Sequence, residues 1–308
     1  MKNADAGARL KRFVLRHSWT RAAAAGPVAI RRIWLNWRRH AREEILDRIS
    51  EIVRADIVFE AEEFGGVFSI DPRSHLLHRY LRNGFYEPEI SRFFLANVKP
   101  HADVLDIGAN IGFYTVAGAK VLTTGRVLAA EPTGAAFKRL SENVLRNGVA
   151  DKVILFNGMI GSSRGQGQIH FIPGMEEYSS MRPPQHSEVR SREADVANVP
   201  MERIDDLVEN HSLRPALIKV DVEGAEFSVF QGAQQTISRY RPVVISEIWR
   251  GPTQADGHSG AELISMFENL SYVVRDLRDP LIKPGLEVVG EVVCIPKEKL
   301  DNSIPENR

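Results

Sequence analysis

The sequence of 308 residues has a single cysteine, no long apolar run and no net charge. Cys294 alone excludes an internal disulfide framework and a multi-cysteine zinc or iron–sulfur site, and it suits a reducing compartment. No apolar run approaches the roughly 18 residues that a membrane-spanning helix needs. Forty basic residues balance forty acidic ones, so the whole chain has no charge that would attract nucleic acid. These absences predict a cytoplasmic protein that binds no nucleic acid.

The balanced charge is unevenly distributed along the chain. Residues 1–42 contain eleven basic residues and one acid, Asp5. Apolar residues recur among the arginines at helical spacing, which is typical of a basic amphipathic helix that lies on an anionic membrane or on a partner. A solvated leader is the alternative. The alanine-rich run at 22–30 is interrupted by glycine and proline, so we do not expect a signal peptide. A second amphipathic stretch at 45–57 predicts a helix that covers the main domain.

From about residue 100, short apolar runs alternate with segments of helical spacing. Strands are predicted at 102–108, 126–131, 152–157, 216–221, 242–247, 272–277 and 287–296, with one helix over 222–237 and another near 260–270. The alternation predicts an α/β fold with a mainly parallel seven-stranded sheet, helices on both faces and a final antiparallel hairpin. A polar segment at 174–200 interrupts the pattern and predicts an inserted loop on the substrate side.

The most informative residues follow the first strand of that sheet. In the run VLDIGANIGFYT, Asp106 ends the strand, and Gly108, Asn110 and Gly112 lead into a helix. The glycines let the backbone turn sharply beside a ligand, at the sheet edge where α/β proteins bind ligands. Glu131 ends the second strand about 20 residues after Gly112, the spacing of a carboxylate that binds a ribose diol. These features indicate a cofactor that contains adenosine.

The same motif argues against a dinucleotide. A dinucleotide fingerprint would have glycine where Asn110 and Phe113 stand. Asp106 would repel a pyrophosphate, but it would attract the ammonium group of an amino-acid moiety. The pattern therefore favours S-adenosylmethionine, and a nicotinamide oxidoreductase on the same layered fold is the alternative.

A second group of charged residues follows the fourth strand. Asp221 ends this strand, Glu223 is expected to start the next helix, and Lys219 points to the same side as Asp221. Because a carboxylate at the end of a buried strand is costly without a partner, Lys219 and Asp221 are predicted to pair and to orient an acceptor hydroxyl. Asp221 is the first candidate for a general base and Glu223 the second. The alternatives are a purely structural ion pair and, for Glu223 and Glu226, stabilisation of the helix dipole.

Two further questions concern the role of Glu87 and the possibility of a metal site. Glu87, in the run FYEPE, either reaches this site or is a surface acid. Asp221 and Glu247 end strands and offer oxygen atoms, but no spacing is diagnostic of a metal site. No metal is therefore predicted.

Five separated motifs resemble the FkbM-type S-adenosylmethionine-dependent methyltransferases. They are RNGFYEPE, VLDIGANIGFYT, AAEP, IKVDVEGAEFSVFQGA and RPVVISEI, and VPMERIDDL is similar to the short strand and helix that precede the fourth strand in that family. The resemblance spans about residues 65–295 and implies a class I (Rossmann-like) methyltransferase fold. It also implies methyl transfer to a hydroxyl oxygen of a carbohydrate, a glycolipid or a secondary metabolite such as a polyketide.

The resemblance assigns roles to single residues and a division to the chain. It implies cofactor binding by Asp106, Gly108, Asn110 and Gly112, ribose binding by Glu131, and an adenine contact by Met159. We expect a helical extension at 1–60, a methyltransferase domain at 61–300 and a tail at 301–308. A third interpretation is a non-catalytic scaffold that keeps the cofactor fold and docks on a membrane or partner through its basic N-terminal helices.

Overall fold

A computed structural model of the chain describes residue 53 and residues 55–183, 189, 191–248, 257–278 and 290–300. The chain divides into two compact units, Met1–Arg54 and Ala55–Arg308. The predicted basic amphipathic segment at 1–42 and the predicted tail at 301–308 lie outside the described residues.

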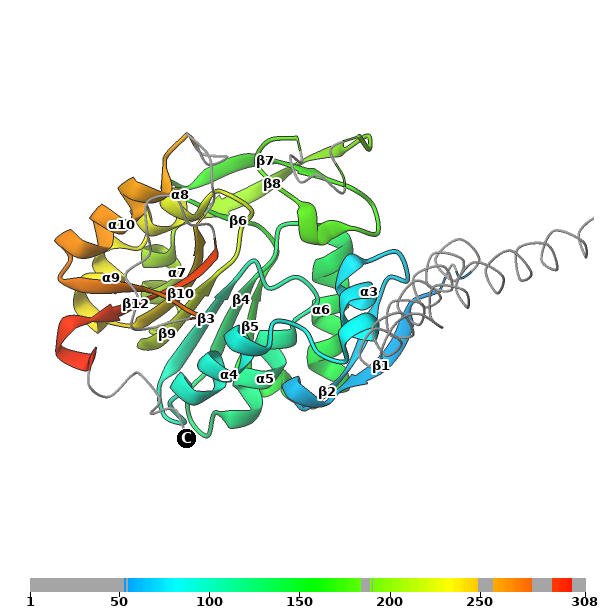
Figure 1. Ribbon diagram of the computed structural model, residues 1–308, viewed down its shortest axis with the longest axis horizontal. Helices are drawn as coiled ribbons and strands as arrows, with labels where there is room; N and C mark the ends of the chain where they lie inside the picture. Colours follow the sequence, from blue (N-terminus) through cyan, green and yellow to red (C-terminus); the bar gives the residue numbers. More distant parts are fainter. Residues whose placement is uncertain are drawn as a thin grey trace, which may run out of the picture. The chain divides into compact units, whose positions relative to one another are not determined.

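A seven-stranded sheet forms the centre of the described domain, with the strand order β11-β12-β10-β9-β3-β4-β5 (Figure 1). Its strands are β3 (Asp103–Ile107), β4 (Val127–Ala130), β5 (Val153–Phe156), β9 (Pro215–Val220), β10 (Val243–Ile248), β11 (Tyr272–Asp276) and β12 (Gly290–Pro296). The neighbours from β5 to β10 pair in parallel, whereas β12 is antiparallel to both β10 and β11. The predicted α/β sheet and its final antiparallel hairpin are confirmed.

Helices cover both faces of this sheet. Successive side chains of a strand point to opposite faces, so each central strand contributes to two cores. Val104 of β3 belongs to the core beneath α4 (Pro88–Asn97), α5 (Phe113–Val121) and α6 (Gly134–Arg146). Leu105 belongs to the core beneath α7 (Ile204–Asn210), α8 (Glu226–Gln231), α9 (Gln234–Tyr240) and α10 (Gly260–Asn269). Cys294 of β12 lies in this second core and is 1% exposed.

The helix predicted over 222–237 is in fact two helices. α8 begins at Glu226, and Gly232 separates it from α9. A Cβ atom at residue 232 would lie 2.1 Å from the carbonyl oxygen of Gly161, so the two backbones can approach only because this residue is glycine. The prediction that Glu223 starts the helix is therefore wrong, because Glu223 lies in the loop before it.

A second sheet replaces part of the loop predicted at 174–200. It consists of β6 (Met159–Ile160), β7 (Gly165–Phe171) and β8 (Asp195–Glu202), in the order β6-β8-β7. The last residues of the predicted loop thus form a strand that pairs with β7 along its whole length. The last residues of β8 belong to the short strand that the VPMERIDDL motif implied. Its first residues were expected in the loop because one face of an antiparallel pair can be exposed to solvent, as Val196 is, with 52% of its surface accessible.

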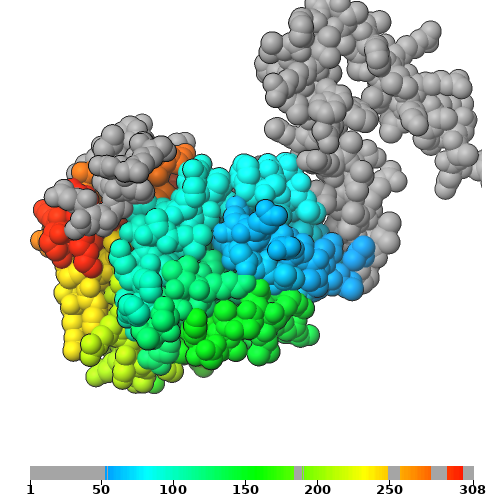
Figure 2. All heavy atoms as spheres, turned by 90° about the horizontal axis from the view of Figure 1, so that it is seen from below, coloured from blue at the N-terminus to red at the C-terminus, as the bar shows by residue number. Residues whose placement is uncertain are grey.

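An antiparallel hairpin, β1 (Ile57–Ala61) and β2 (Gly66–Ile70), begins the described domain. Ile57 was expected on a helix and lies in β1 instead. Figure 2 shows this hairpin, in blue, beside the cyan residues of α3 (His75–Asn83), and the rings of Phe59 and Tyr80 are 5.0 Å apart. Within the described ranges, no helix has the length and apolar character that crossing a membrane requires.

Candidate active site

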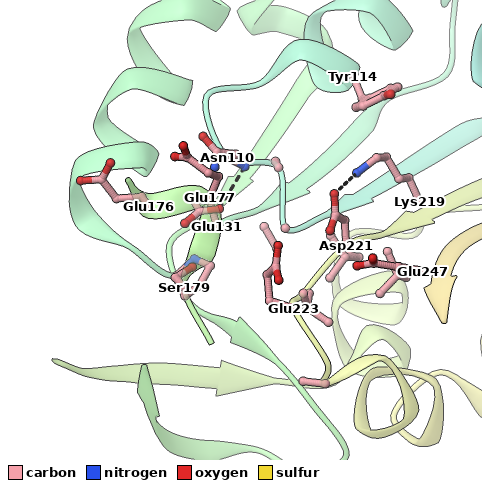
Figure 3. Close-up of a pocket in the computed structure, with 18 of the residues that line it drawn as sticks. Asn110, Tyr114, Glu131, Glu176, Glu177, Ser179, Lys219, Asp221, Glu223 and Glu247 are labelled. Atoms are coloured by element: carbon pink, nitrogen blue, oxygen red, sulfur yellow. Dashed lines mark hydrogen bonds and ion pairs between the residues drawn. The ribbon is translucent and has the colours of Figure 1, made fainter. Parts of the chain in front are cut away.

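A cavity opens at the carboxyl edge of the central sheet, where β3, β4, β9 and β10 end. Its lining includes four predicted cofactor-binding residues and all three predicted catalytic residues: Gly108, Asn110, Glu131, Met159, Lys219, Asp221 and Glu223. Figure 3 shows Asn110 and Glu131 on one side and Asp221 and Glu223 on the other. We call Gly108, Asn110 and Glu131 the β3–β4 wall. We call Lys219, Asp221, Glu223 and Glu247 the β9–β10 wall.

The β3–β4 wall is built around a close backbone contact at Gly108. This residue has a φ of +78°, in the left-handed region that favours glycine. A Cβ atom at this position would lie only 1.8 Å from the carbonyl oxygen of Asp221. The turn after β3 therefore packs directly on the turn after β9, and the two walls share this contact.

The carboxylate of Glu131 is held in place by hydrogen bonds from the protein. Oε2 accepts the backbone N–H of Asn110 at 3.0 Å, and Oε1 accepts the backbone N–H and the hydroxyl of Thr133 at 2.9 and 2.6 Å. Burial raises the pKa of Glu131 to about 7, although the hydrogen bonds from Thr133 and Asn110 act to lower it. The β3–β4 wall thus presents a fixed carboxyl group to the cavity.

Asp106 and Gly112 do not line the cavity. Asp106 is 1% exposed, and its Oδ2 accepts a hydrogen bond from the Thr115 hydroxyl at 2.5 Å. Its Oδ1 has no hydrogen-bond partner among the described residues, and burial raises the pKa of this carboxyl group. Gly112 is the residue before α5. Asp106 is thus buried and Gly112 is the last residue of the turn, and the contact of both residues with a cofactor stays a prediction.

The predicted pairing of Lys219 and Asp221 is confirmed on the β9–β10 wall. Lys219 Nζ lies 3.0 Å from Asp221 Oδ2, and Figure 3 shows this ion pair. The Lys219 side chain is 5% exposed and that of Asp221 is 36% exposed, so Asp221 is the partner that faces the cavity. Burial opposes the charge of Lys219, but the carboxylates of Asp221, Asp106 and Glu87 raise its pKa above the usual value.

Glu223 has a different environment from Asp221. Its backbone is in the left-handed region, with a φ of 51°, and its carbonyl oxygen accepts a hydrogen bond from the Ser180 hydroxyl at 3.0 Å. Burial, followed by the negative charges of Asp221 and Glu247, raises the pKa of Glu223 well above its usual range. Glu223 therefore retains its proton more readily than an exposed glutamate and is better suited to donate a hydrogen bond than to act as a base.

Glu226, rather than Glu223, stands at the start of the helix. It is fully buried, and its Oε1 accepts the backbone N–H groups of Val222 and Gly224, each at 3.2 Å. Burial raises its pKa to about 7. The structural alternative considered for both glutamates thus applies to Glu226, which shapes the loop that contains Glu223.

A segment that we call the strap, residues 172–181, forms part of the cavity lining. It includes the first residues of the inserted loop predicted at 174–200, but its contacts with α3 were not predicted. The Glu177 carboxylate accepts the backbone N–H of His75 at 2.5 Å and the Ser74 hydroxyl at 3.2 Å, at the start of α3. The Tyr178 hydroxyl lies 2.9 Å from His75 Nδ1 and accepts a hydrogen bond from Arg79 at 3.1 Å. Nothing in the polar composition of the strap indicated these contacts with a helix 100 residues earlier.

Two other cavity residues come from the elements before and after β3. Glu87 precedes α4, and Tyr114 is in the first turn of α5. The Tyr114 hydroxyl donates a hydrogen bond to Glu87 Oε2 at 3.0 Å. Within the described residues, no group of three or more histidine, cysteine, aspartate or glutamate side chains is arranged to hold a metal ion.

The order of the sheet, the glycine turn after β3 and the acid at the end of β4 define a class I methyltransferase fold with a nucleoside-binding edge. The Methyltransferase FkbM domain matches residues 106–274, which is more than half of the chain. The chain belongs to this family of S-adenosylmethionine-dependent methyltransferases.

The individual proteins that resemble this chain have low sequence identity to it. Methyltransferase sdnD of Sordaria araneosa is 25% identical over 179 residues, which are 50% of this chain and 69% of that protein. The crystal structure of methyltransferase FkbM from Methylobacillus flagellatus is 18% identical, with a TM-score of 0.41, and the match covers 70% of this chain and 46% of that one. An O-methyltransferase from Bacillus cereus, solved with SAH, is 13% identical, with a TM-score of 0.41 and coverage of 82% and 97%. The chain thus spans less than half the length of the Methylobacillus protein.

The residues of the cavity fit S-adenosylmethionine as the cofactor of this family. Gly108 lacks the Cβ atom that would block the turn, and the fixed carboxyl group of Glu131 is suited to accept hydrogen bonds from ribose hydroxyls. Met159 lines the same cavity and offers an apolar contact. These residues would hold the nucleoside part of the cofactor.

Proposed function

We propose that the chain is an O-methyltransferase that methylates a hydroxyl group of a carbohydrate, a glycolipid or a secondary metabolite. The observation that carries this proposal is the position of Asp221, which faces the cavity while Lys219 holds one of its oxygen atoms at 3.0 Å. The family resemblance supports a hydroxyl acceptor, and membership in a methyltransferase family favours this interpretation over a nicotinamide oxidoreductase.

The residues of the β9–β10 wall have distinct roles in this proposal. When bound, S-adenosylmethionine supplies an electrophilic methyl group. Asp221 accepts the proton that the acceptor hydroxyl loses, and Lys219 orients the Asp221 carboxylate through their ion pair. Glu223, whose pKa is raised by burial, donates a hydrogen bond to the acceptor from its protonated form. Gly108, Asn110, Glu131 and Met159 fix the cofactor opposite these residues, so that most of the rate increase comes from positioning.

The test is Asp221→Asn, which removes the base and keeps the shape of the side chain. Purified protein is first screened with radiolabelled S-adenosylmethionine against sugars, glycolipids and polyketides. With the acceptor found, we expect kcat of Asp221→Asn to fall by about 10²- to 10⁴-fold. Affinity for S-adenosylhomocysteine, measured by calorimetry, stays within about twofold, because Asp221 is not in the β3–β4 wall.

The matched control is Asp151→Asn, the same change at an exposed position. Its kcat and affinity stay at wild-type values. If Asp221→Asn retains full turnover, Asp221 is not the base. If the wild-type protein binds S-adenosylhomocysteine and methylates nothing in the screen, the result supports the scaffold interpretation instead.

We also propose a peripheral membrane contact for the basic segment at 1–42, from its sequence pattern alone. A chain that lacks residues 1–42 is expected to lose binding to vesicles of anionic lipid, because the excess of basic residues is removed. Cosedimentation with phosphatidylserine vesicles measures the change, and vesicles of neutral lipid are the control. Equal binding of the full and the shortened chain contradicts this proposal.

A further inference from the structure

Glu87, the residue directly before α4, has an unusual backbone conformation and lacks the usual side-chain capping contact. Its φ and ψ are 48° and 59°, in the left-handed region that a glutamate rarely adopts. A residue at this position commonly accepts a hydrogen bond from the first turn of its own helix, but Glu87 makes no such side-chain bond. The Glu87 carboxylate turns instead to the Tyr114 hydroxyl, 3.0 Å away on α5. The contact between Glu87 and Tyr114 therefore does not serve to cap α4.

Tyr114 connects Glu87 to the ion pair of the β9–β10 wall. The Nζ atom of Lys219 lies 4.7 Å from the centre of the Tyr114 ring, within the range of a cation–π contact. Edge-on contacts with Phe64 and Phe94, at 5.2 and 5.1 Å between ring centres, hold the ring. Figure 3 shows Tyr114, Lys219 and Asp221 in succession toward the cavity. Glu87 before α4, Tyr114 on α5 and Lys219 on β9 therefore form a continuous chain of contacts that ends at Asp221, just after β9.

The charged groups along this chain of contacts influence the pKa of Glu87. Burial raises the pKa of Glu87 to about 7. The ammonium group of Lys219 acts to lower this pKa, the carboxylate of Asp221 acts to raise it, and hydrogen bonds from Tyr86 and Tyr114 act to lower it. Glu87 is thus a second carboxylate near Lys219, and it also lines the cavity.

We propose that Glu87 is a positioning residue for methyl transfer: through Tyr114 it holds the Lys219 ammonium group, which in turn holds Asp221 toward the acceptor. The proposal rests on the proposed function, because it assigns Glu87 a role only through Asp221. It predicts that ionised Glu87 supports turnover and that protonated Glu87 supports it less well, since a neutral carboxyl group binds the Tyr114 hydroxyl more weakly and gives Lys219 no second negative charge.

The test compares Glu87→Gln with Glu89→Gln, the same change at an exposed residue of the same helix turn. With the acceptor from the screen, we expect kcat of Glu87→Gln to fall roughly tenfold above pH 7. KM for S-adenosylmethionine stays within about twofold, because the β3–β4 wall is untouched. Below about pH 6 the wild type and Glu87→Gln converge, because Glu87 is then protonated in the wild type. Glu89→Gln keeps the wild-type profile.

A second variant tests the route through Tyr114. Tyr114→Phe keeps the ring beside Lys219 and removes the hydroxyl, so it reproduces the loss seen in Glu87→Gln. The double variant loses no more than either single variant, because both changes break the same chain of contacts. Additive losses, or a pH profile of Glu87→Gln parallel to that of the wild type, overturn the proposal.

A measurement without acceptor separates this proposal from the proposed function. The ammonium signal of Lys219 in ¹H–¹⁵N NMR spectra, assigned by its loss in Lys219→Arg, is expected to shift or broaden in Glu87→Gln and to stay unchanged in Glu89→Gln. A shifted signal together with full activity of Asp221→Asn supports the contact chain and contradicts Asp221 as the base. An unshifted signal together with inactive Asp221→Asn contradicts the role of Glu87 and leaves the proposed function standing.

Discussion

The two walls of the cavity are built in different ways. In the β3–β4 wall, backbone N–H groups of Asn110 and Thr133 bind the Glu131 carboxylate, and a glycine allows the turns to touch. In the β9–β10 wall, side chains hold one another, as in the pair of Lys219 and Asp221. The carboxylate of the β3–β4 wall is thus fixed largely by backbone groups, whereas the carboxylate of the β9–β10 wall is fixed by another side chain. The comparison indicates that Glu131 is held more rigidly than Asp221, whose ion pair with Lys219 leaves its side chain 36% exposed.

The largest expected effect breaks the contact that both walls share. Gly108→Ala places a Cβ atom 1.8 Å from the Asp221 carbonyl oxygen, at a φ of +78°. We expect the free energy of unfolding to fall by about 4 kcal/mol or more, because backbone must move on both sides. Urea denaturation measures the loss. Gly134→Ala is the control, because nothing lies within 4 Å of its added Cβ atom. A Gly108→Ala protein as stable as this control would show that the walls are not coupled.

The pH dependence of stability reports on the buried carboxyl groups of the two regions. Burial raises the pKa of Glu131, on the β3–β4 wall, and of Glu226, behind the β9–β10 wall, from 4.5 to about 7. Between these pH values the folded state binds protons that the unfolded state has lost, so stability falls as the pH rises and levels off above about pH 7.

We expect each of these two groups to lower the free energy of unfolding without cofactor by roughly 2.5 kcal/mol from pH 5 to pH 8, as measured by urea denaturation. Glu131→Gln and Glu226→Gln each flatten part of the slope, and the size of each change gives the share of that residue. Stability that rises over this range would contradict the environments described for both groups.

The smallest expected effect tests whether the β3–β4 wall binds the cofactor. Glu131→Gln removes a charged acceptor from the β3–β4 wall and is expected to weaken binding of S-adenosylhomocysteine by about 1.5–3 kcal/mol. Isothermal titration calorimetry measures this change, with Glu142→Gln on the exposed side of α6 as the control. At saturating cofactor, kcat of Glu131→Gln recovers toward the wild type, in contrast to Asp221→Asn. Unchanged affinity would remove Glu131 from the cofactor site.

The fold and the β3–β4 wall could be predicted because their signals are local. Apolar runs gave the seven strands, and the motif around Gly108 placed the turn and the strand-end acid together. The pairing of Lys219 and Asp221 followed from the period of two in a strand.

Other features depended on contacts between distant segments, and local patterns do not encode such contacts. The strap contacts α3 across about 100 residues of sequence, as in the hydrogen bond that the His75 backbone N–H donates to Glu177. Glu87 reaches Lys219 only through Tyr114. The break at Gly232 arises from the backbone of Gly161, and β8 has a polar face that resembles a loop. These are the features that the sequence analysis missed or misplaced.

The buried position of Cys294 makes this chain suited to site-specific labelling. Its thiol is 1% exposed, and burial raises its pKa, so the reactive thiolate is scarce in the folded protein. A cysteine introduced at exposed Val196 of β8 would then react with a maleimide dye while Cys294 stays unmodified, so the native cysteine need not be replaced first. Fluorescence from that single dye would report how the small sheet beside the cavity responds as cofactor and acceptor bind.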